Sequence, residues 1–313
     1  MKKLEQVSCE GVTWINIEKP TREDIEALAQ YYPFHRLDLE DCLSKIQLTK
    51  IDEYEDYLFI ILHFPIIDDS TGMVRSSQVS IFLGKDYLVT IHQGDLKPLI
   101  NNYRICKIDE SRREKMVIKG SVYILYQIID SLVDDIFPTL NKLMEELYQI
   151  EDKVFDEKVE AVREVTFLRR KIADLRRIIF PLRRVMKELT IKVQRFSRQD
   201  ISNYFDDIND HIEKIWETLE ECKETIEIYK DTDFILATEK TNKILALLTI
   251  VFTLSIPATV IATFYGMNIP LPGGIETGPW TFLGPYTTLI IITIISIIPA
   301  LVMLVIFRRL GWI

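Results

Sequence analysis

The side chains with the most capacity for chemistry in this sequence are oxygen donors and one imidazole. Asp207 and His211 are four residues apart, so they lie on one face of the helix that their segment predicts. Asn268 follows Gly266 and Met267 at the end of a long apolar run and adds a side-chain amide oxygen. These residues either bind a cation or have ordinary structural roles. The structural alternatives are a solvated or hydrogen-bonded helix face for the first pair and a helix C-cap for the second.

Catalytic chemistry is not indicated. The sequence holds no GxxxxGK[ST], GxGxxG, HExxH or GxSxG motif. Its four cysteines are scattered without a CxxC pair, which predicts neither a disulfide framework nor a thiolate zinc site and favours a reducing compartment. These cysteines are Cys9, Cys42, Cys106 and Cys222. The sequence therefore predicts a protein that is not an enzyme and that uses no organic cofactor.

Charge is distributed very unevenly along the 313 residues. Residues 1–243 hold 36 of the 38 Lys/Arg and 46 of the 47 Asp/Glu, a net charge of −10. Residues 244–313 hold only Glu276, Arg308 and Arg309. An acidic body is therefore followed by an almost uncharged tail. This division rules out an ordinary soluble enzyme, and the acidity of the body argues against a nucleic-acid partner.

The tail contains two uncharged runs of 22 residues each, 244–265 and 286–307. A helix needs about 20 apolar residues to cross a hydrocarbon core about 30 Å thick. Both runs are long enough, and both are too long and too uniform for ordinary core helices. The sequence predicts two membrane-spanning helices in residues 244–313, joined by an outer loop at 266–285.

The flanks of the two runs set the orientation. Lys240 and Lys243 precede the first run, and Arg308 and Arg309 follow the second, whereas residues 266–285 hold no basic residue. By the positive-inside rule both termini are cytoplasmic, as expected for a multi-pass protein of the cell (plasma or inner) membrane. A hairpin of two helices cannot enclose a polar path by itself. Conduction would require several copies around an axis.

The acidic body divides into a mixed α/β part, residues 1–119, and a helical part, residues 120–243. The first part alternates strand and helix signals, and Thr21 opens a capping-box pattern for a helix through about Tyr31. Strands are expected at 12–17, 57–64, 78–82 and 87–92, the last two forming a hairpin.

The helical part contains a heptad pattern, in which apolar residues step alternately by four and three. These residues are Ile208, Ile212, Ile215, Leu219, Cys222, Ile226 and Tyr229. The pattern predicts a seam that packs against other helices. No glycine or proline interrupts residues 201–256, which favours one helix of about 98 Å from the body into the membrane over residues 201–265. A break near Asp231 is the alternative. So long a helix needs neighbours, and copies of itself are the simplest candidates.

The order of these features resembles a known family. Tyr265-Gly266-Met267-Asn268 follows a long helix, and a short acidic loop, a second span and a basic end come after it. Upstream segments are also similar, at residues 40–43, 50–59, 130–135, 180–183 and 240–242. Over its whole length the chain resembles the CorA-type magnesium transporters, the GMN-motif divalent cation channels.

The resemblance implies a membrane protein that assembles as a homopentamer. Its cytoplasmic α/β domain and long helical stalk would form a funnel, with two transmembrane helices per chain in contact with lipid. Gly266, Met267 and Asn268 would form the selectivity filter. Mg²⁺ dehydrates reluctantly, so neutral oxygens around its water shell suit it. The residues matching the family's pore lining and gate are Asn242, Leu245, Leu248, Ile256 and Thr259.

The resemblance also implies divalent-cation sites between neighbouring subunits. Mg²⁺ would there be a regulatory ligand as well as the substrate, because bridging ions relieve repulsion between acidic bodies. The matching residues are Glu40, Asp41, Asp130, Asp207 and His211, and Asp231 would lie near the narrow end of the funnel. Two departures from the family are Ile256, where methionine is frequent, and a basic end reduced to Arg308 and Arg309.

Three functions follow. The first is a magnesium channel or transporter mediating potential-driven influx, gated by cytoplasmic Mg²⁺, with Co²⁺ or Ni²⁺ as secondary ions. The second is a zinc transporter on the same scaffold, although that branch usually varies the residue at Met267. The third is a non-conducting, membrane-anchored coiled-coil scaffold, which leaves the motif ending in Asn268 without a role.

The predicted topology is testable by labelling. Because the charge bias places residues 266–285 outside, Glu276→Cys should react in intact cells with a membrane-impermeant maleimide. The four native cysteines are replaced beforehand, and a cysteine introduced at Lys240 serves as the inward-facing control. Labelling at position 276 only after the membrane is broken would overturn the assignment.

Overall fold

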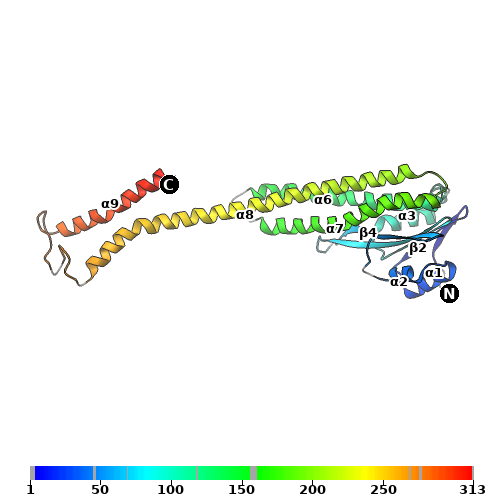
Figure 1. The fold of residues 1–313 in the computed structure, drawn as a ribbon, viewed down its shortest axis with the longest axis horizontal. Coiled ribbons are helices and arrows are strands. Elements are labelled where there is room, and N and C mark those ends of the chain that lie inside the picture. The colour runs from blue at the N-terminus through cyan, green and yellow to red at the C-terminus, as the bar shows by residue number, and fades with distance from the viewer. Residues whose placement is uncertain are drawn as a thin grey trace. The chain divides into compact units, whose positions relative to one another are not determined.

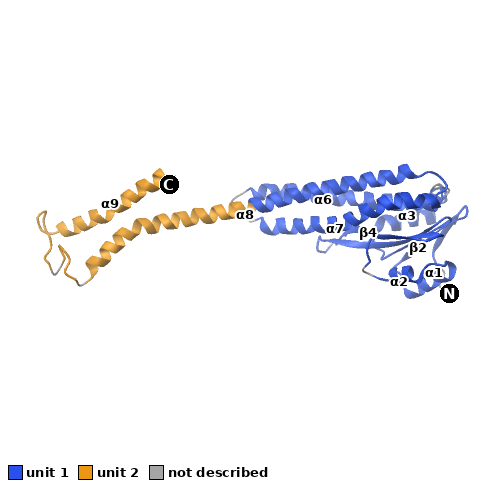
Figure 2. Ribbon diagram, in the orientation of Figure 1, with its two compact units in different colours: residues 1–232 blue, residues 233–313 orange. Residues whose placement is uncertain are grey.

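The computed structural model describes residues 4–44, 47–68, 70–117, 119–155, 161–267, 269–274 and 277–311. The expected filter residue Asn268 and the loop residue Glu276 lie outside the described residues. The chain divides into two compact units, residues 1–232 and residues 233–313 (Figure 2).

A mixed sheet forms the centre of the first unit, with six strands in its described residues. Their order across the sheet is β1-β2-β6-β5-β4-β3. β2 and β6 pair in parallel, and the other neighbours pair antiparallel. The strands are β1 (Gln6–Cys9), β2 (Val12–Glu18), β3 (Lys50–Glu53), β4 (Tyr57–Ile67), β5 (Val74–Gly84) and β6 (Tyr87–His92).

The four strands expected from the sequence are all present, and the expected hairpin joins β5 to β6. The apolar run that predicted a buried strand is β4. Its side chains alternate between two hydrophobic cores, Phe59 and Ile61 in one, Ile60 and Leu62 in the other. A strand covered on both faces has no polar side, which is why its sequence is continuously apolar.

Helices cover both faces of this sheet (Figure 1). One face carries α1 (Arg22–Tyr31) and α2 (Arg36–Asp41). The capping box expected at Thr21 is present, since its side chain and that of Asp24 each accept from the other's backbone N–H. The other face carries helices of the second core. These are α3 (Lys97–Ile108), α4 (Glu110–Val117), α5 (Ser121–Asp134), α6 (Ile136–Val154) and α7 (Val162–Lys192), with the 3₁₀ turn η1 (Val193–Phe196) leading to α8 (Ser202–Gly266).

The predicted heptad seam lies on α8 and is buried inside the single chain. Phe205 and the seven seam residues through Tyr229 belong to the same core as buried residues of α5, α6 and α7. Phe205 packs against Tyr126, and Tyr229 packs against Phe155. The neighbours of this part of α8 are therefore helices of its own chain rather than copies of itself. Each buried side chain contributes roughly 1.5–3 kcal/mol.

A ladder of ion pairs runs beside the seam between α7 and α8. Three arginines of α7 at seven-residue intervals meet three glutamates of α8 at seven-residue intervals in the reverse direction. The pairs are Arg169–Glu227 at 2.8 Å, Arg176–Glu220 at 2.5 Å and Arg183–Glu213 at 2.7 Å. Partly exposed pairs stabilise by only about 0–1 kcal/mol each. Their main effect is to fix the antiparallel register of the two helices.

α8 continues as one helix to Gly266, without the alternative break near Asp231. Its last buried side chain is Tyr229, and the boundary between the two units follows Thr232. The described part of the second unit consists of the rest of α8, α9 (Thr287–Arg309) and the segment between them. The two predicted spans are thus helical.

Candidate metal centre and membrane spans

Asp130, Asp207 and His211 come together at the packing contact of α5 with α8. One potential ligand atom from each lies within 4.8 Å of the others. α5 contributes Asp130, and α8 contributes the pair spaced by four residues, which do share a helix face. The side chains of Asp130 and His211 are half-buried, while that of Asp207 is exposed. Among the predicted site residues, these three form the cluster that one chain assembles.

The electrostatics of this cluster favour a cation. Burial raises the pKa of Asp130, and the nearby carboxylates of Asp134 and Asp207 raise it further, against the lowering effect of His211. Burial first, and then the charges of Asp130 and Asp207, also raise the pKa of Tyr126 to about 12. Negative charge is thus concentrated at one place.

The imidazole of His211 has an unused atom. Its Nδ1 is buried without a hydrogen-bond partner and lies 3.6 Å from an Oδ1 of Asp134. The ring packs edge-on against Phe137, with ring centroids 5.7 Å apart. A buried imidazole nitrogen beside a carboxylate is a suitable donor to a transition metal, and the carboxylates suit Mg²⁺.

The spacing of the ligand atoms limits how an ion is held. Two ligands of one Mg²⁺ at about 2.1 Å lie at most about 4.2 Å apart. The three ligand atoms of the cluster all lie within 4.8 Å of one another. This spacing is close to that limit, so the cluster is compact enough for one ion to contact its side chains directly or through its water shell.

Asp134 is a member of this environment that the sequence reasoning did not assign. It follows Asp130 by four residues on α5, so both carboxylates lie on the helix face toward His211. This spacing mirrors that of Asp207 and His211 on α8. Two such i, i+4 pairs on facing helices are the sequence signal by which this cluster can be recognised.

The predicted residues of α2 lie elsewhere and are paired within the chain. Glu40 accepts from Nε of Arg36 at 2.9 Å. Asp41 accepts from Nε2 of Gln47 at 2.9 Å and pairs with Nζ of Lys50, also at 2.9 Å. These contacts do not bring the α2 carboxylates to the Asp130 cluster within one chain.

Lys50 is a cation held permanently beside Asp41. Burial lowers the pKa of Lys50, but hydrogen bonds to Asp52 and Asp41 outweigh that effect and raise the pKa above its usual range. The buried carboxyl of Asp38 holds α2 in place by accepting from the hydroxyls of Tyr57 at 3.0 Å and Tyr54 at 3.1 Å.

The residues expected to line a pore lie on α8 beyond its last buried residue. At 3.6 residues per turn they fall within an arc of about 120° of the helix surface. They are Asn242, Leu245, Leu248, Ile256 and Thr259. The leucines and the isoleucine are about half exposed in the single chain. Asp231 precedes them, is exposed and lies 3.4 Å from Nζ of Lys230.

Four hydroxyl groups of the first span are hydrogen-bonded to the backbone of their own helix. Thr249, Ser255, Thr259 and Thr263 each donate to the carbonyl four residues earlier. Such bonds let a hydroxyl enter an apolar solvent. α8 and α9 are both long and apolar enough to cross a membrane, and no residue in their most apolar windows is buried within the chain. They are not core helices of the described structure.

The end of α8 leaves its backbone accessible. Gly266 is the last helical residue, and a Cβ built on it would meet no atom within 4 Å. The N–H of Met267 donates to the carbonyl of Phe264 at 3.2 Å, and the Met267 side chain is half exposed. The hydroxyl of Tyr265 donates to the carbonyl of Pro272 at 3.0 Å and ties the helix end to the following segment.

Known proteins resemble this chain over nearly its whole length. A family model described as CorA-like Mg²⁺ transporter protein matches residues 10–309. The cobalt/magnesium transport protein CorA of Thermotoga maritima is 30% identical over 304 residues, which cover 96% of this chain and 83% of that protein. The putative metal ion transporter YfjQ of Bacillus subtilis is 30% identical, covering 85% of this chain and 82% of that protein.

The fold also has a solved counterpart. The complete structure of the CorA magnesium transporter from Methanocaldococcus jannaschii matches with a TM-score of 0.78 at 23% identity. The match covers 100% of this chain and 95% of that one. At that identity the likeness establishes the fold alone, which includes the α/β unit, the long helix and the two apolar helices.

The negative charge of Asp130 should lower the free energy of unfolding of the metal-free protein at neutral pH. The pKa of Asp130 is higher in the folded state than the ordinary aspartate value. The free energy of unfolding therefore falls as the pH rises from the ordinary pKa to the raised one. Above the raised pKa the full loss of stability is present. Asp130 makes no hydrogen bond among the described residues. Asp130→Asn should therefore stabilise the EDTA-treated protein at pH 7 by up to about 1 kcal/mol.

The same variant should gain less stability than the wild type when Mg²⁺ is added, because it has lost a ligand. Thermal unfolding in detergent, followed by circular dichroism at pH 7 and pH 3, measures both effects. The difference in EDTA should vanish at pH 3, where the carboxyl is protonated. A variant less stable than the wild type in EDTA at pH 7 would contradict the assignment.

Proposed function

The chain belongs to the family of CorA-like Mg²⁺ transporter proteins, and from this membership we propose that it conducts Mg²⁺ into the cell. The observation that carries the proposal is the family match over residues 10–309, which includes both spans and the segment between them. The membrane potential would drive influx, since a divalent ion gains about 4.6 kcal/mol per 100 mV. Co²⁺ and Ni²⁺ would be secondary ions. The family is one of transporters and not of enzymes.

Several copies must surround the path, because two spans per chain cannot enclose one. The resemblance makes this assembly a homopentamer, with residues 1–243 as a cytoplasmic funnel of α/β domains (1–119) and helical stalks (120–243). The exposed apolar side chains of α8 after Tyr229 support this, since no residue that the structure describes buries them. The protein would lie in the cell membrane with both termini cytoplasmic.

The ion path would follow one face of α8 from Asn242 to Thr259. Rings of Leu248 and Ile256 would close it, because a narrow apolar constriction loses its water. The face holds no carboxylate, which suits passage of a hydrated ion without tight binding. Gly266 and Asn268 would present neutral oxygens to the water shell of Mg²⁺ at the outer end.

The cytoplasmic sites would regulate this path. Residues 1–243 carry −10, so five copies would bring about −50 together. Divalent ions at Glu40, Asp41, Asp130, Asp207 and His211 would offset that repulsion and stabilise a closed funnel, and Asp231 would meet the ion at the funnel neck. At low Mg²⁺ these ions would dissociate, the subunits would move apart, and the rings of Leu248 and Ile256 would widen. Such a population shift requires that the ions bind the closed state more tightly than the open state.

The test of transport is ion flux into proteoliposomes. Asn268→Ala removes the amide oxygen that a hydrated ion would contact, so Mg²⁺ uptake should fall at least about tenfold while assembly stays normal. Thr277→Ala, in the same outer segment, serves as the control and should conduct normally. Mg²⁺, Co²⁺, Ni²⁺ and Zn²⁺ are compared directly.

The outcomes separate the candidate functions. Preferred uptake of Zn²⁺ would favour the zinc transporter, and no flux of any ion through a correctly assembled protein would favour the non-conducting scaffold. Normal Mg²⁺ flux in Asn268→Ala would reduce Asn268 to a structural cap.

Regulation is tested at Asp207. Asp207→Asn keeps the shape of the side chain and removes one charge, so it weakens both the ion binding and the repulsion that opens the funnel. Inhibition by internal Mg²⁺ should move to about tenfold higher concentration, equivalent to about 1.4 kcal/mol of binding free energy. The preference among ions should not change.

The measurement is patch-clamp current against internal Mg²⁺. Asp206→Asn is the matched control, since Asp206 is the preceding exposed aspartate of α8 and lies outside the cluster. Superimposable inhibition curves for wild type and Asp207→Asn would show that Asp207 is not part of the sensor.

A further inference from the structure

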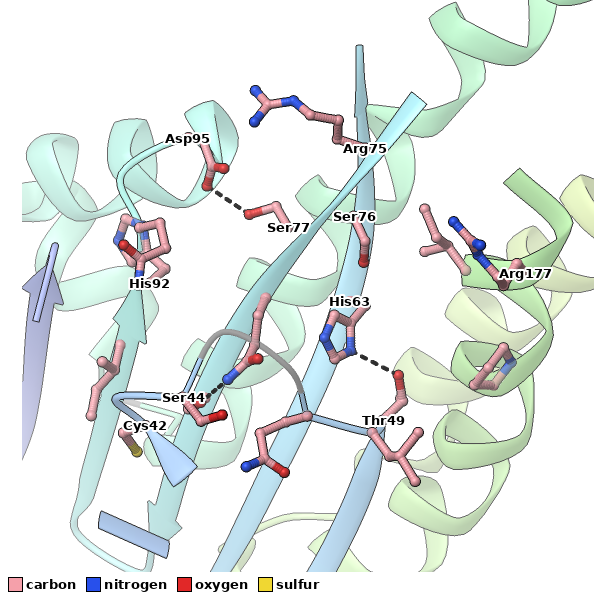
Figure 3. Close-up of a pocket in the computed structure, with 18 of the residues that line it drawn as sticks. Cys42, Ser44, Thr49, His63, Arg75, Ser76, Ser77, His92, Asp95 and Arg177 are labelled. Atoms are coloured by element: carbon pink, nitrogen blue, oxygen red, sulfur yellow. Dashed lines mark hydrogen bonds between the residues drawn. The ribbon is translucent and has the colours of Figure 1, made fainter. Parts of the chain in front are cut away.

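The first unit contains a cavity that none of the cation chemistry uses. It has a volume of about 660 Å³, within the usual range for small-molecule sites. Its walls come from the middle of the sheet, the segment after α2 and one side of α7 (Figure 3). The candidate cation ligands described above do not line it.

The sequence of α7 explains the charge on one wall. Arginine pairs occur at 169–170, 176–177 and 183–184, again seven residues apart. The first arginine of each pair forms the ladder with α8. The second is turned about 100° further round the helix, away from those glutamates. Arg177 and Arg184, two members of this second row, line the cavity.

Within the part of the chain that the structure describes, most of the positive charge of this row is not neutralised. α7 holds ten Lys/Arg and three Asp/Glu within an acidic protein. Arg184 has no ion pair among the described residues. In the described ranges, the ion-pair partner of Arg177 is Asp174, at 3.1 Å, and the Arg177 side chain is 79% exposed. Such an exposed pair contributes little and leaves guanidinium N–H groups free.

A third arginine comes from the sheet. Arg75 of β5 lines the cavity and pairs through Nε with Asp68 at 3.2 Å, which leaves the two terminal nitrogens for another partner. Asp95 is the only acidic residue among the described residues of the lining, and one of its oxygens accepts from the Ser77 hydroxyl at 2.6 Å. The lining therefore has an excess of positive charge.

The remaining polar groups are uncharged. Thr49 and the Nδ1 of His63 are hydrogen-bonded at 3.0 Å, and burial lowers the pKa of His63, so the imidazole is neutral at pH 7. Ser76 adds a hydroxyl. Neutral donors beside guanidinium groups are suited to an oxyanion and its organic substituent, whereas three arginines disfavour a cation.

We propose that this cavity binds a phosphate group, carried by a small phosphorylated metabolite of about nucleotide size. The guanidinium groups of Arg177 and Arg184, both on α7, hold the phosphate oxygens, since their planar forks match that geometry. Arg75 lines another part of the cavity and adds positive charge to it (Figure 3). The rest of the ligand occupies the hydroxyl-lined part near Thr49 and His63. This site does not depend on the ion that the protein transports.

The test is isothermal titration calorimetry on the full-length protein in detergent at fixed free Mg²⁺. The probes are adenosine monophosphate, inorganic phosphate and adenosine. The monophosphate should bind and adenosine should not. Arg177→Gln with Arg184→Gln should weaken binding at least about tenfold, since two charged hydrogen-bond donors are lost. Arg75→Gln, on a different element, should weaken it as well.

Arg170→Gln is the matched control, because Arg170 belongs to the same row of α7 but does not line the cavity. Its affinity should equal that of the wild type, and all variants should unfold at the wild-type temperature. Inorganic phosphate that binds as tightly as the monophosphate would identify free phosphate as the source of the same group. Absence of binding by both phosphate probes, equal binding of adenosine, or equal weakening by Arg170→Gln would each overturn the proposal.

Discussion

The packing of α8 against α7 fixes the rotation and the axial position of the first part of α8, which carries Asp207 and His211. Two kinds of interaction act along this contact. The buried seam from Phe205 to Tyr229 contributes most of the stability, because each apolar side chain is worth more than an exposed ion pair. The arginine–glutamate ladder fixes the antiparallel register of α7 and α8, since a shift of one heptad would leave an arginine or a glutamate without its partner. α8 runs unbroken from Ser202 to Gly266, so the chain passes from the first unit into the second within this helix.

The same contact explains how an acidic protein keeps a strongly basic helix. One row of α7 arginines faces the glutamates of α8 and is neutralised there, while the next row, one residue further, faces elsewhere. A repeat of seven residues keeps each row on one side of the helix, with a drift of only about 20° per repeat. Segregation of charge on one helix thus produces two environments, a neutral interface with α8 and a positive wall at the sheet.

Local signals in the sequence were sufficient for the elements but not for the contacts between them. The capping box at Thr21, the apolar run of β4 and the heptads of α8 each depend on neighbours within a few residues, and each is present. The i, i+4 pair of Asp207 and His211 was equally local. Its meeting with Asp130, 77 residues earlier, came only from the family resemblance, and Asp134 was missed because acidic residues are usually solvated. The seam does pack against other helices, as its periodicity predicts, but periodicity alone does not reveal which helices cover it.

The two acidic regions of the first unit differ in how their charge is balanced. Asp41 and Asp52 share the ammonium of Lys50, so this part of the chain supplies its own cation. Asp130, Asp134 and Asp207 have no lysine or arginine partner among the described residues, and the nearest basic group is the imidazole of His211. The balance there must come from a proton, which the raised pKa of Asp130 favours, or from a metal ion. The cluster thus combines carboxylates that can take up a proton with an imidazole that can ligate a metal, on the helix that continues into the first candidate membrane span.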